Sequence, residues 1–166
     1  KTKVYINEEY MKCDLKIVLG SCVPHGVAGF GGGAKLVMPG IASFDTVNYH
    51  HGTGGAGMNP TDVDQKPTQG MGIIENNRFR QDLTEAAELA GIDFLINTIV
   101  NLWGESVSIY AGHWQQAFDA ALVDAKKHYR TPVTGDKDIV ISNSYGKVSE
   151  SMIALPLSLP LVSRQG

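Results

Sequence analysis

The sequence predicts a layered α/β domain in which a mostly parallel β-sheet is flanked by helices. Short apolar runs with the character of strands alternate along the chain with amphipathic helical patterns. The 166 residues are 43% hydrophobic and carry a formal net charge of -3, so the chain can form a buried core without disulfides. Glycine is in excess, with 19 residues, and it is concentrated in one part of the chain rather than spread along a linker.

The first half of the chain predicts one strand, one helix and a long loop. Residues 15–19 form a short apolar run that ends in glycine, which is typical of a buried strand that leads into a loop. Ser43 is a suitable N-cap for a helix over residues 44–51, and Gly52 is its C-terminal stop. Residues 52–72 are rich in Gly, Pro, Thr and Asp, and they predict a long surface loop.

The second half repeats the alternation of helix and strand. Apolar residues recur at helical spacing over residues 76–90, and Gly91 ends this pattern. A second amphipathic helix is predicted over residues 114–129. Strands are predicted at residues 94–100, 107–110 and 139–141.

A linker-like segment divides the chain near its end. Residues 131–138 combine proline, glycine, threonine and charged residues. We therefore expect residues 1–136 to belong to one α/β domain and residues 137–166 to cross into a second. The chain begins with lysine and ends without a capping pattern, so we also expect it to be an internal fragment of a longer polypeptide.

Several functional classes are excluded by composition. The apolar stretch over residues 152–162 contains two prolines and is shorter than the ~20 residues of a membrane-spanning helix. Lysine and arginine form no basic stripe, so nucleic acid is not an expected partner. Cys13 and Cys22 form no C-x-x-C pair, which favours free thiols in the cytoplasm over a loop disulfide.

The glycines indicate a binding site. Eleven of the 19 lie between residues 20 and 57, together with three of the five histidines. Residues 29–36 read GFGGGAKL, but a P-loop requires Gly-Lys followed by Ser or Thr. The same residues match only half of a dinucleotide fingerprint, because no strand directly precedes them and no acidic residue follows at ~20 positions. What remains is a cofactor site on the glycine-rich loop of a Rossmann-like domain, where backbone N–H groups can cradle an anion beside the Lys35 amine.

The histidines leave several interpretations open. His50 and His51 are adjacent, and on a helix their side chains point about 100° apart, so at most one of them is expected to bind a given metal ion. His113 is expected at a turn from strand to helix, where capping or packing is favoured over catalysis.

A longer pattern around these residues resembles a known family. Residues 24–35 read PHGVAGFGGGAK, residues 36–42 read LVMPGIA, and His51 follows. This run is similar to the core motif of the lactate racemase family, which uses a nickel-pincer nucleotide. The spacing agrees as well, since Lys35 lies ten residues after His25 and His51 lies sixteen residues after Lys35. The resemblance continues more weakly through almost all of the chain.

The resemblance implies a racemase or epimerase of a small, lactate-like 2-hydroxy acid. The reaction would combine proton abstraction with reversible hydride transfer to a nickel-pincer nucleotide joined covalently to Lys35. His51 would be the protein ligand of the nickel, and His25 would be one of two acid/base histidines. The other residues implied to bind the cofactor are Gly31, Gly32, Gly33 and Tyr145. Proteins that synthesise the cofactor would be partners.

Physical chemistry agrees with the role of Lys35. A lysine can form an amide-like bond only when its amine is neutral, and partial burial beside the apolar residues 36–38 favours that form. Sulfur donors combined with one imidazole also suit nickel(II).

Three questions stay open at the level of sequence. The second acid/base group would lie upstream of this chain, although His113 or His50 are alternatives. Gly31 stands where the family has serine, and Gly26-Val27 replace a Pro-Phe pair, so a 2-hydroxy acid other than lactate fits equally well. The alternative function is a nucleotide-binding or cofactor-carrier module without catalysis of its own.

Overall fold

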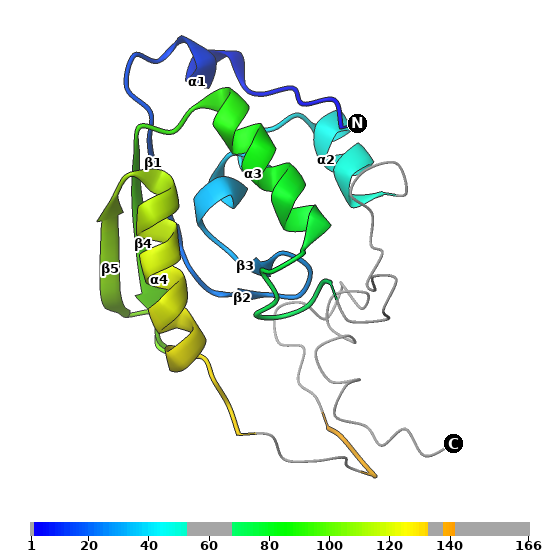
Figure 1. Ribbon diagram of the computed structural model, residues 1–166, viewed down its shortest axis with the longest axis vertical. Helices are drawn as coiled ribbons and strands as arrows, with labels where there is room; N and C mark the ends of the chain where they lie inside the picture. The colour runs from blue at the N-terminus through cyan, green and yellow to red at the C-terminus, as the bar shows by residue number, and fades with distance from the viewer. Residues whose placement is uncertain (1, 53–67, 133–137, 142–166) are drawn as a thin grey trace. The chain divides into compact units, whose positions relative to one another are not determined.

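The computed structural model describes residues 2–52, 68–132 and 138–141. The chain divides into two compact units, Lys1–Tyr129 and Arg130–Gly166. Every helix and strand described here belongs to the first unit (Figure 1). The predicted domain boundary at residue 136 falls outside the described residues, so the assignment of residues 1–136 and 137–166 to two domains stays a prediction.

The predicted helices and strands of the first unit are all present, but the strand expected over residues 15–19 lies at Ile17–Ser21 and is not a buried strand, because only its Val18 is buried. Along the chain the elements are α1 (Glu8–Lys12), β1 (Ile17–Ser21), β2 (Pro24–His25), β3 (Gly29–Phe30), the 3-10 helix η1 (Gly33–Leu36), α2 (Phe44–His51), α3 (Arg78–Ala90), β4 (Phe94–Val100), β5 (Ser106–Gly112) and α4 (Trp114–His128). The short elements α1, β2, β3 and η1 were not predicted, because elements of two to five residues have no measurable periodicity.

The predicted strand at residues 139–141 is wrong. These residues have no strand conformation, and Ile139 and Ile141 are almost fully exposed. Their β-branched side chains favour a strand, but a strand also requires a neighbouring strand to pair with, and none of the described strands takes that role.

The main sheet has three strands in the order β1-β4-β5 (Figure 1). β1 and β4 are parallel, while β4 and β5 are antiparallel. The mixed sheet corrects the expectation of a mostly parallel one. The reason is the short connection over residues 101–105, since a parallel return would require a crossover of a dozen or more residues. The Rossmann-like topology stays a prediction.

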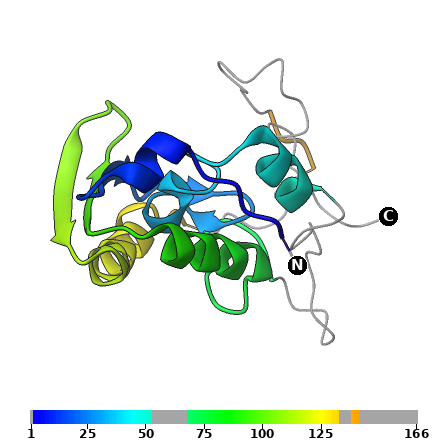
Figure 2. The same ribbon diagram turned by 90° about the horizontal axis from the view of Figure 1, so that it is seen from above.

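The core lies between the sheet and the two long helices. α3 and α4 lie side by side in both views (Figures 1 and 2). The fully buried side chains include Phe79 and Leu83 of α3, Leu95 and Ile99 of β4, and Ala121 of α4. These residues form one apolar cluster with the glycine-rich segment of the chain, which contributes Phe30, Ala34, Val37 and Met38. The segment that carries the candidate site is therefore part of the core.

The remaining expectations concern thiols and membrane helices. Cys13 and Cys22 are free thiols, as predicted, with Cys13 exposed and Cys22 buried. Among the residues described, no helix is both long enough and apolar enough to span a membrane.

Candidate functional site

The glycine-rich segment begins with a small hairpin that orients His25. β2 and β3 are antiparallel, with Pro24 opposite Phe30 and His25 opposite Gly29. The Nδ1 atom of His25 accepts hydrogen bonds from the backbone N–H groups of Val27, at 3.2 Å, and Ala28, at 3.1 Å. A proton on Nδ1 would face both of these donors, so the neutral ring carries its proton on Nε2. The hairpin therefore sets both the orientation and the tautomer of His25.

The next residues, Gly31 to Gly33, pass close to side chains of the protein itself. Gly32 has a φ of +72°, and a Cβ atom there would lie 2.6 Å from Oδ1 of Asn97. Gly33 has a φ of +55°, and its Cβ would lie 2.8 Å from the ring of Phe118. Both positions require glycine because of backbone conformation and space. The structure thus gives these glycines a packing role, and their contact with a cofactor stays a prediction.

Asn97 is an unusual residue beneath this loop. It lies in β4 and is completely buried, and neither its amide oxygen nor its amide nitrogen has a hydrogen-bond partner among the described residues. An unpartnered buried amide typically costs about 1–3 kcal/mol. A buried polar group without a partner calls for an explanation in a native fold. One such explanation is a ligand or ion that binds to the group.

Lys35 follows the loop directly and lies on η1. Its backbone N–H donates to the carbonyl of Gly32 at 3.2 Å, and its carbonyl accepts from the N–H of Gly40 at 3.2 Å. Burial, the main cause, and the positive charge of Arg80 together lower the pKa of its amine to about 8. The pKa is thus lowered in the direction that the expected neutral amine requires.

Arg80 is a functional candidate that was not singled out from the sequence. Only 5% of its surface is exposed, and its Nη1 atom donates to the carbonyl of Phe30 at 2.9 Å. Its guanidinium lies 4.1 Å from the centre of the Phe118 ring. A signal was available, because Arg80 lies three residues before Leu83 and seven before Ala87 and so shares the buried face of the helix. A charged residue on that face indicates a specific role.

Asn77 joins the same helix to the hairpin. As the N-cap of α3, its Oδ1 atom accepts from the N–H of Arg80 at 3.0 Å. Its Nδ2 atom donates to the carbonyls of Val27, at 2.8 Å, and Ile73, at 2.9 Å. Asparagine before a helical pattern is a known capping signal, whereas the bond to Val27 could not be read from the sequence.

The two adjacent histidines at the end of α2 have different environments. His51 is exposed, and its Nδ1 atom lies 2.9 Å from the carbonyl of Val47. A carbonyl can only accept, so Nδ1 carries the proton and the Nε2 lone pair is the one suited to a metal. His50 is fully buried, with Nε2 3.3 Å from the carbonyl of Phe79. The pKa of His50 is lowered, and burial is the main cause. The fully buried position of the ring argues against the alternative in which His50 is an acid/base group.

Electrostatics relates α2 to Lys35. The positive charge of Lys35 is one of the influences that lower the pKa of His50, so the end of α2 that carries both histidines lies within electrostatic reach of the lysine.

His113 is exposed at the N-terminus of α4, at the predicted turn from strand to helix. Tyr145 lies outside the described residues.

The described residues contain no complete metal site of their own. No three side chains of His, Cys, Asp or Glu within them lie together as possible metal ligands. A single imidazole at His51 is therefore compatible only with a metal whose other ligands come from elsewhere, such as a cofactor.

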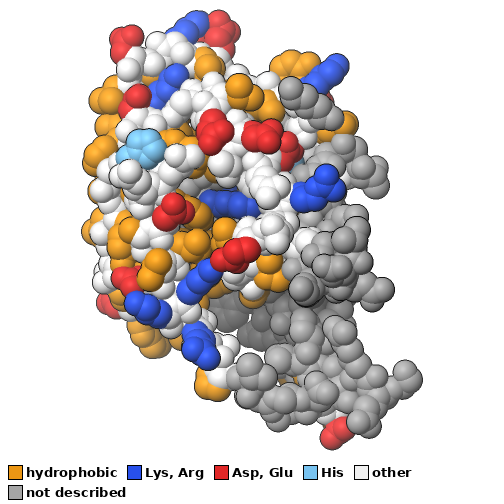
Figure 3. Space-filling view, in the orientation of Figure 1, with side chains coloured by type: hydrophobic (Ala, Val, Ile, Leu, Met, Phe, Trp, Pro, Cys, Tyr) orange, Lys and Arg blue, Asp and Glu red, His pale blue; other side chains and the backbone are white. Residues whose placement is uncertain are grey.

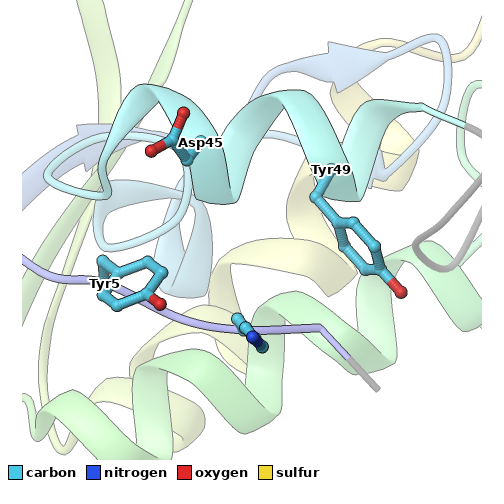
Figure 4. Close-up of a pocket in the computed structure, with 4 residues that line it drawn as sticks. Tyr5, Asp45 and Tyr49 are labelled. Carbon is cyan, nitrogen blue, oxygen red and sulfur yellow. The ribbon is translucent and has the colours of Figure 1, made fainter.

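A surface cleft is found away from the predicted site residues. It has a volume of about 320 Å³ and is lined by Lys3 and Tyr5 from the N-terminal segment and by Asp45 and Tyr49 from α2 (Figure 4). None of the predicted site residues that the structure describes lines it. The candidate site is thus formed by the hairpin, the glycine loop and Lys35, with Arg80 and Asn97 beneath them.

Comparisons of sequence identify similar proteins. A family model described as the lactate racemase N-terminal domain matches residues 1–88. A lactate racemase from Thermoanaerobacterium thermosaccharolyticum is 31% identical over 115 residues, which is 69% of this chain and 25% of the relative. A lactate racemase from Lactiplantibacillus plantarum is 31% identical over 141 residues, which is 85% of this chain and 31% of the relative. The chain therefore spans about a quarter to a third of these relatives.

Comparisons of structure agree with this result. The chain is similar to the lactate racemase apoprotein from Thermoanaerobacterium thermosaccharolyticum, with a TM-score of 0.63 and 29% identity over 73% of this chain and 27% of the other. A crystal structure of a protein from Thermotoga maritima has a TM-score of 0.58 at 21% identity, covering 80% of this chain and 32% of the other. The second similarity concerns the fold alone.

Proposed function

Since the chain belongs to the lactate racemase family, we propose that it is the cofactor-bearing part of a racemase or epimerase that acts on a small 2-hydroxy acid. One observation carries the proposal. The amine of Lys35 is partly buried, its pKa is lowered to about 8, and hydrogen bonds hold its backbone at both N–H and carbonyl. This is the state in which a lysine can act as an attachment residue.

The residues present fit the nickel-pincer nucleotide that the family resemblance implies. Lys35 would hold the cofactor covalently, and His51 would ligate the nickel through Nε2. Gly31, Gly32, Gly33 and Tyr145 would line the cofactor. The orphaned amide of Asn97 beneath Gly32 supports a polar ligand at this loop. The chemistry that such a cofactor supplies when bound is reversible acceptance of a hydride.

His25 would move a proton at its Nε2 atom. In the tautomer that the hairpin favours, Nε2 carries a proton and faces away from the two N–H groups that bind Nδ1. His25 would therefore begin as the group that donates to the substrate oxygen, and its partner would begin as the acceptor. Inversion of a carbon centre requires acid/base groups on both faces of the substrate. The partner of His25 would come from sequence upstream of this chain, and His113 stays the alternative.

A second candidate function is a cofactor-carrier module without catalysis of its own. The observation that favours it is that the described contacts of the site, Gly32 with Asn97 and Arg80 with Phe30, concern the loop and the lysine that would hold a cofactor. In this case residues 1–136 would bind and present the cofactor and residues 137–166 would enter a second domain. Cofactor-synthesis proteins would be partners in either case, and a cytoplasmic location would suit both.

The chain should acquire the cofactor when it is produced in a host that also makes the cofactor-synthesis proteins. Intact-mass analysis should find one large adduct, peptide mapping should locate it at Lys35, and metal analysis should find one nickel per chain. Lys35→Arg keeps the charge but cannot form the bond, so it should lack the adduct. An unmodified Lys35 together with absent nickel in such a host would refute the proposal.

The nickel ligand is tested in the same host. His51→Ala should lose nickel while the adduct at Lys35 remains, because the covalent bond does not depend on the imidazole. His128→Ala is the matched control, since His128 is also an exposed histidine at the C-terminal end of a helix. Unchanged nickel in His51→Ala would mean that another residue is the ligand. Racemisation by the loaded chain would exclude the carrier module, whereas a loaded but inactive chain is expected both for the carrier and for an enzyme whose partner histidine lies outside this chain.

A further inference from the structure

We propose that Arg80 is a positioning residue that supports the turn carrying Lys35 and places a fixed positive charge there that favours the neutral, reactive form of the Lys35 amine. The inference rests on the proposed role of Lys35 as the attachment residue. It goes beyond that role, because it names the group that prepares the amine before any cofactor is bound.

The guanidinium of Arg80 lies against the chain segment that leads into Lys35. Arg80 extends from the first turn of α3 toward the segment between the hairpin and η1. Its Nη1 atom holds the Phe30 carbonyl at 2.9 Å. Its Nη2 atom lies 3.2 Å from the position that a Cβ of Gly33 would occupy. The guanidinium therefore binds the chain just before Gly31 and lies close to it again at Gly33, directly ahead of Lys35.

The guanidinium of Arg80 stacks on an aromatic ring. One of its faces lies over the ring of Phe118, 4.1 Å from the ring centre, and such stacking stabilises a buried cation. None of the described carboxylates forms an ion pair with Arg80. The positive charge is thus fixed in position and is not neutralised by a direct partner.

Three other titratable groups interact with Lys35 or Arg80. Cys22 follows β1, and burial raises the pKa of its thiol to about 11, so it is neutral at physiological pH. Asp119 of α4 is exposed and acts on Arg80 from a distance. His50 of α2 interacts with Lys35, but burial lowers its pKa and favours the neutral ring. Among the residues that the structure describes, Arg80 is therefore the positive charge that lowers the pKa of Lys35.

These observations determine which of the two cations gives up its proton. Burial lowers the pKa of Arg80 only to about 10, so the guanidinium stays charged at neutral pH. Two like charges in a poorly solvated region repel each other, and the repulsion is relieved when the weaker base is deprotonated. Lys35 is that base, and deprotonation exposes the lone pair that forms a bond to carbon.

The test measures the reactivity of Lys35 without the cofactor. The probe is N-hydroxysuccinimidyl acetate: the amine nitrogen forms a bond to the acetyl carbon, N-hydroxysuccinimide leaves, and the amine proton goes to the buffer. The chain is treated briefly at pH values from about 6.5 to 9.5, and peptide mass spectrometry compares Lys35 with the exposed Lys126 as an internal reference. In the unsubstituted chain, the relative rate at Lys35 should be half-maximal near pH 8, as its pKa of about 8 requires.

Substitutions of Arg80 separate charge from hydrogen bonding. Arg80→Gln keeps an N–H donor for Phe30 but removes the charge, so the profile of Lys35 should shift to higher pH. At pH 7.5 acetylation should fall about threefold or more, which corresponds to about half a pKa unit. Arg80→Lys keeps the charge and should restore the profile. Phe118→Leu removes the stacked ring without changing charge, and its profile should stay close to that of the unsubstituted chain.

Two results would overturn the proposal. One is an unchanged ratio of Lys35 to Lys126 acetylation in Arg80→Gln. The other is an equal shift in Arg80→Gln and Arg80→Lys, which would mean that shape rather than charge is responsible. Circular dichroism checks folding, and sucrose is added to all samples if Arg80→Gln is unstable, because it favours the compact state. The acetylation experiment uses neither the cofactor nor nickel. A negative result would therefore contradict the role of Arg80 without affecting the adduct and nickel tests of the proposed function.

Discussion

Gly32 illustrates how a single residue can determine the path of the loop that precedes Lys35. Its positive φ and its contact with the buried Asn97 leave no space for a side chain. Gly26 lies in the same segment, but a Cβ atom there would meet nothing within 4 Å and its φ is not positive. The two glycines therefore form a matched pair for substitution.

Gly32→Ala should destabilise the chain, whereas Gly26→Ala should not. We expect the free energy of unfolding to fall by roughly 1–3 kcal/mol for Gly32→Ala, because of backbone strain and contact with the Asn97 amide. For Gly26→Ala the change should stay within about 0.5 kcal/mol. Urea denaturation followed by circular dichroism measures both. Equal stability of the two variants would show that the loop at Gly32 relaxes without cost.

At the residue scale, the sequence was most informative where function depends on spacing along the chain. His25, Lys35 and His51 were selected by their intervals and neighbours. Helical spacing places Arg80 on the buried face of its helix, but its bond to the Phe30 carbonyl fifty positions away could not be read from the sequence. Asn97 was not selected, because its significance depends on an unpartnered amide beneath a loop 65 positions away, which is a tertiary property.

At the scale of elements, α2 depends on its first turn. Ser43 caps this helix through a bond from the N–H of Thr46 to its Oγ atom at 3.2 Å. Thr46 is almost fully buried, and its hydroxyl joins the helix to the carbonyl of Lys3 and the N–H of Tyr5. The position of His51 at the other end of the helix therefore depends on contacts made at its beginning.

Ser43→Ala should cost about 1 kcal/mol, the usual value for loss of an N-cap. Ser43→Asp should retain most of the stability, because aspartate also accepts at the cap and its charge suits the helix N-terminus. Thermal denaturation measures both variants. If alanine and aspartate are equally destabilising, the hydroxyl of Ser43 contributes through its contact with the Thr46 hydroxyl rather than as a cap.

The elements predicted best were those with clear start and stop signals in the sequence. The helix at Phe44–His51 was predicted with its cap and its end, and the strand at Phe94–Val100 was predicted to the residue. The hairpin of β2 and β3 was not predicted, since strands of two residues have no alternation to detect. The short connection before β5 is sufficient to indicate its antiparallel direction, whereas the general α/β pattern favours a parallel one.

At the scale of the whole first unit, the two faces of the sheet differ. Val18, Leu95 and Ile99 point into the core, and the alternating residues point the other way. On this second face Leu19 and Ile109 are about two-thirds exposed. Hydrophobic side chains are also visible along the side where β5 and α4 lie (Figure 3). The described residues leave an apolar sheet surface open to solvent.

An open apolar sheet face should cause the isolated chain to self-associate. The double substitution Leu19→Thr and Ile109→Thr keeps strand-favouring residues but removes apolar surface, so it should reduce association. Leu89→Thr is the control, because Leu89 is at least as exposed but lies on α3. Size-exclusion chromatography with light scattering measures the mass over a range of concentrations. Association that is reduced equally by the control would point to general hydrophobicity rather than to this face.

Asn77 has a further consequence for how this region can vary among related proteins. One amide caps α3 and also binds two carbonyls, one of them four residues earlier in the chain and the other fifty residues earlier. Substitutions at the intervening positions leave these bonds possible, whereas an added or deleted residue between Ile73 and Asn77 would move the amide away from both carbonyls. Over these five positions, it is length rather than residue identity that selection is expected to preserve.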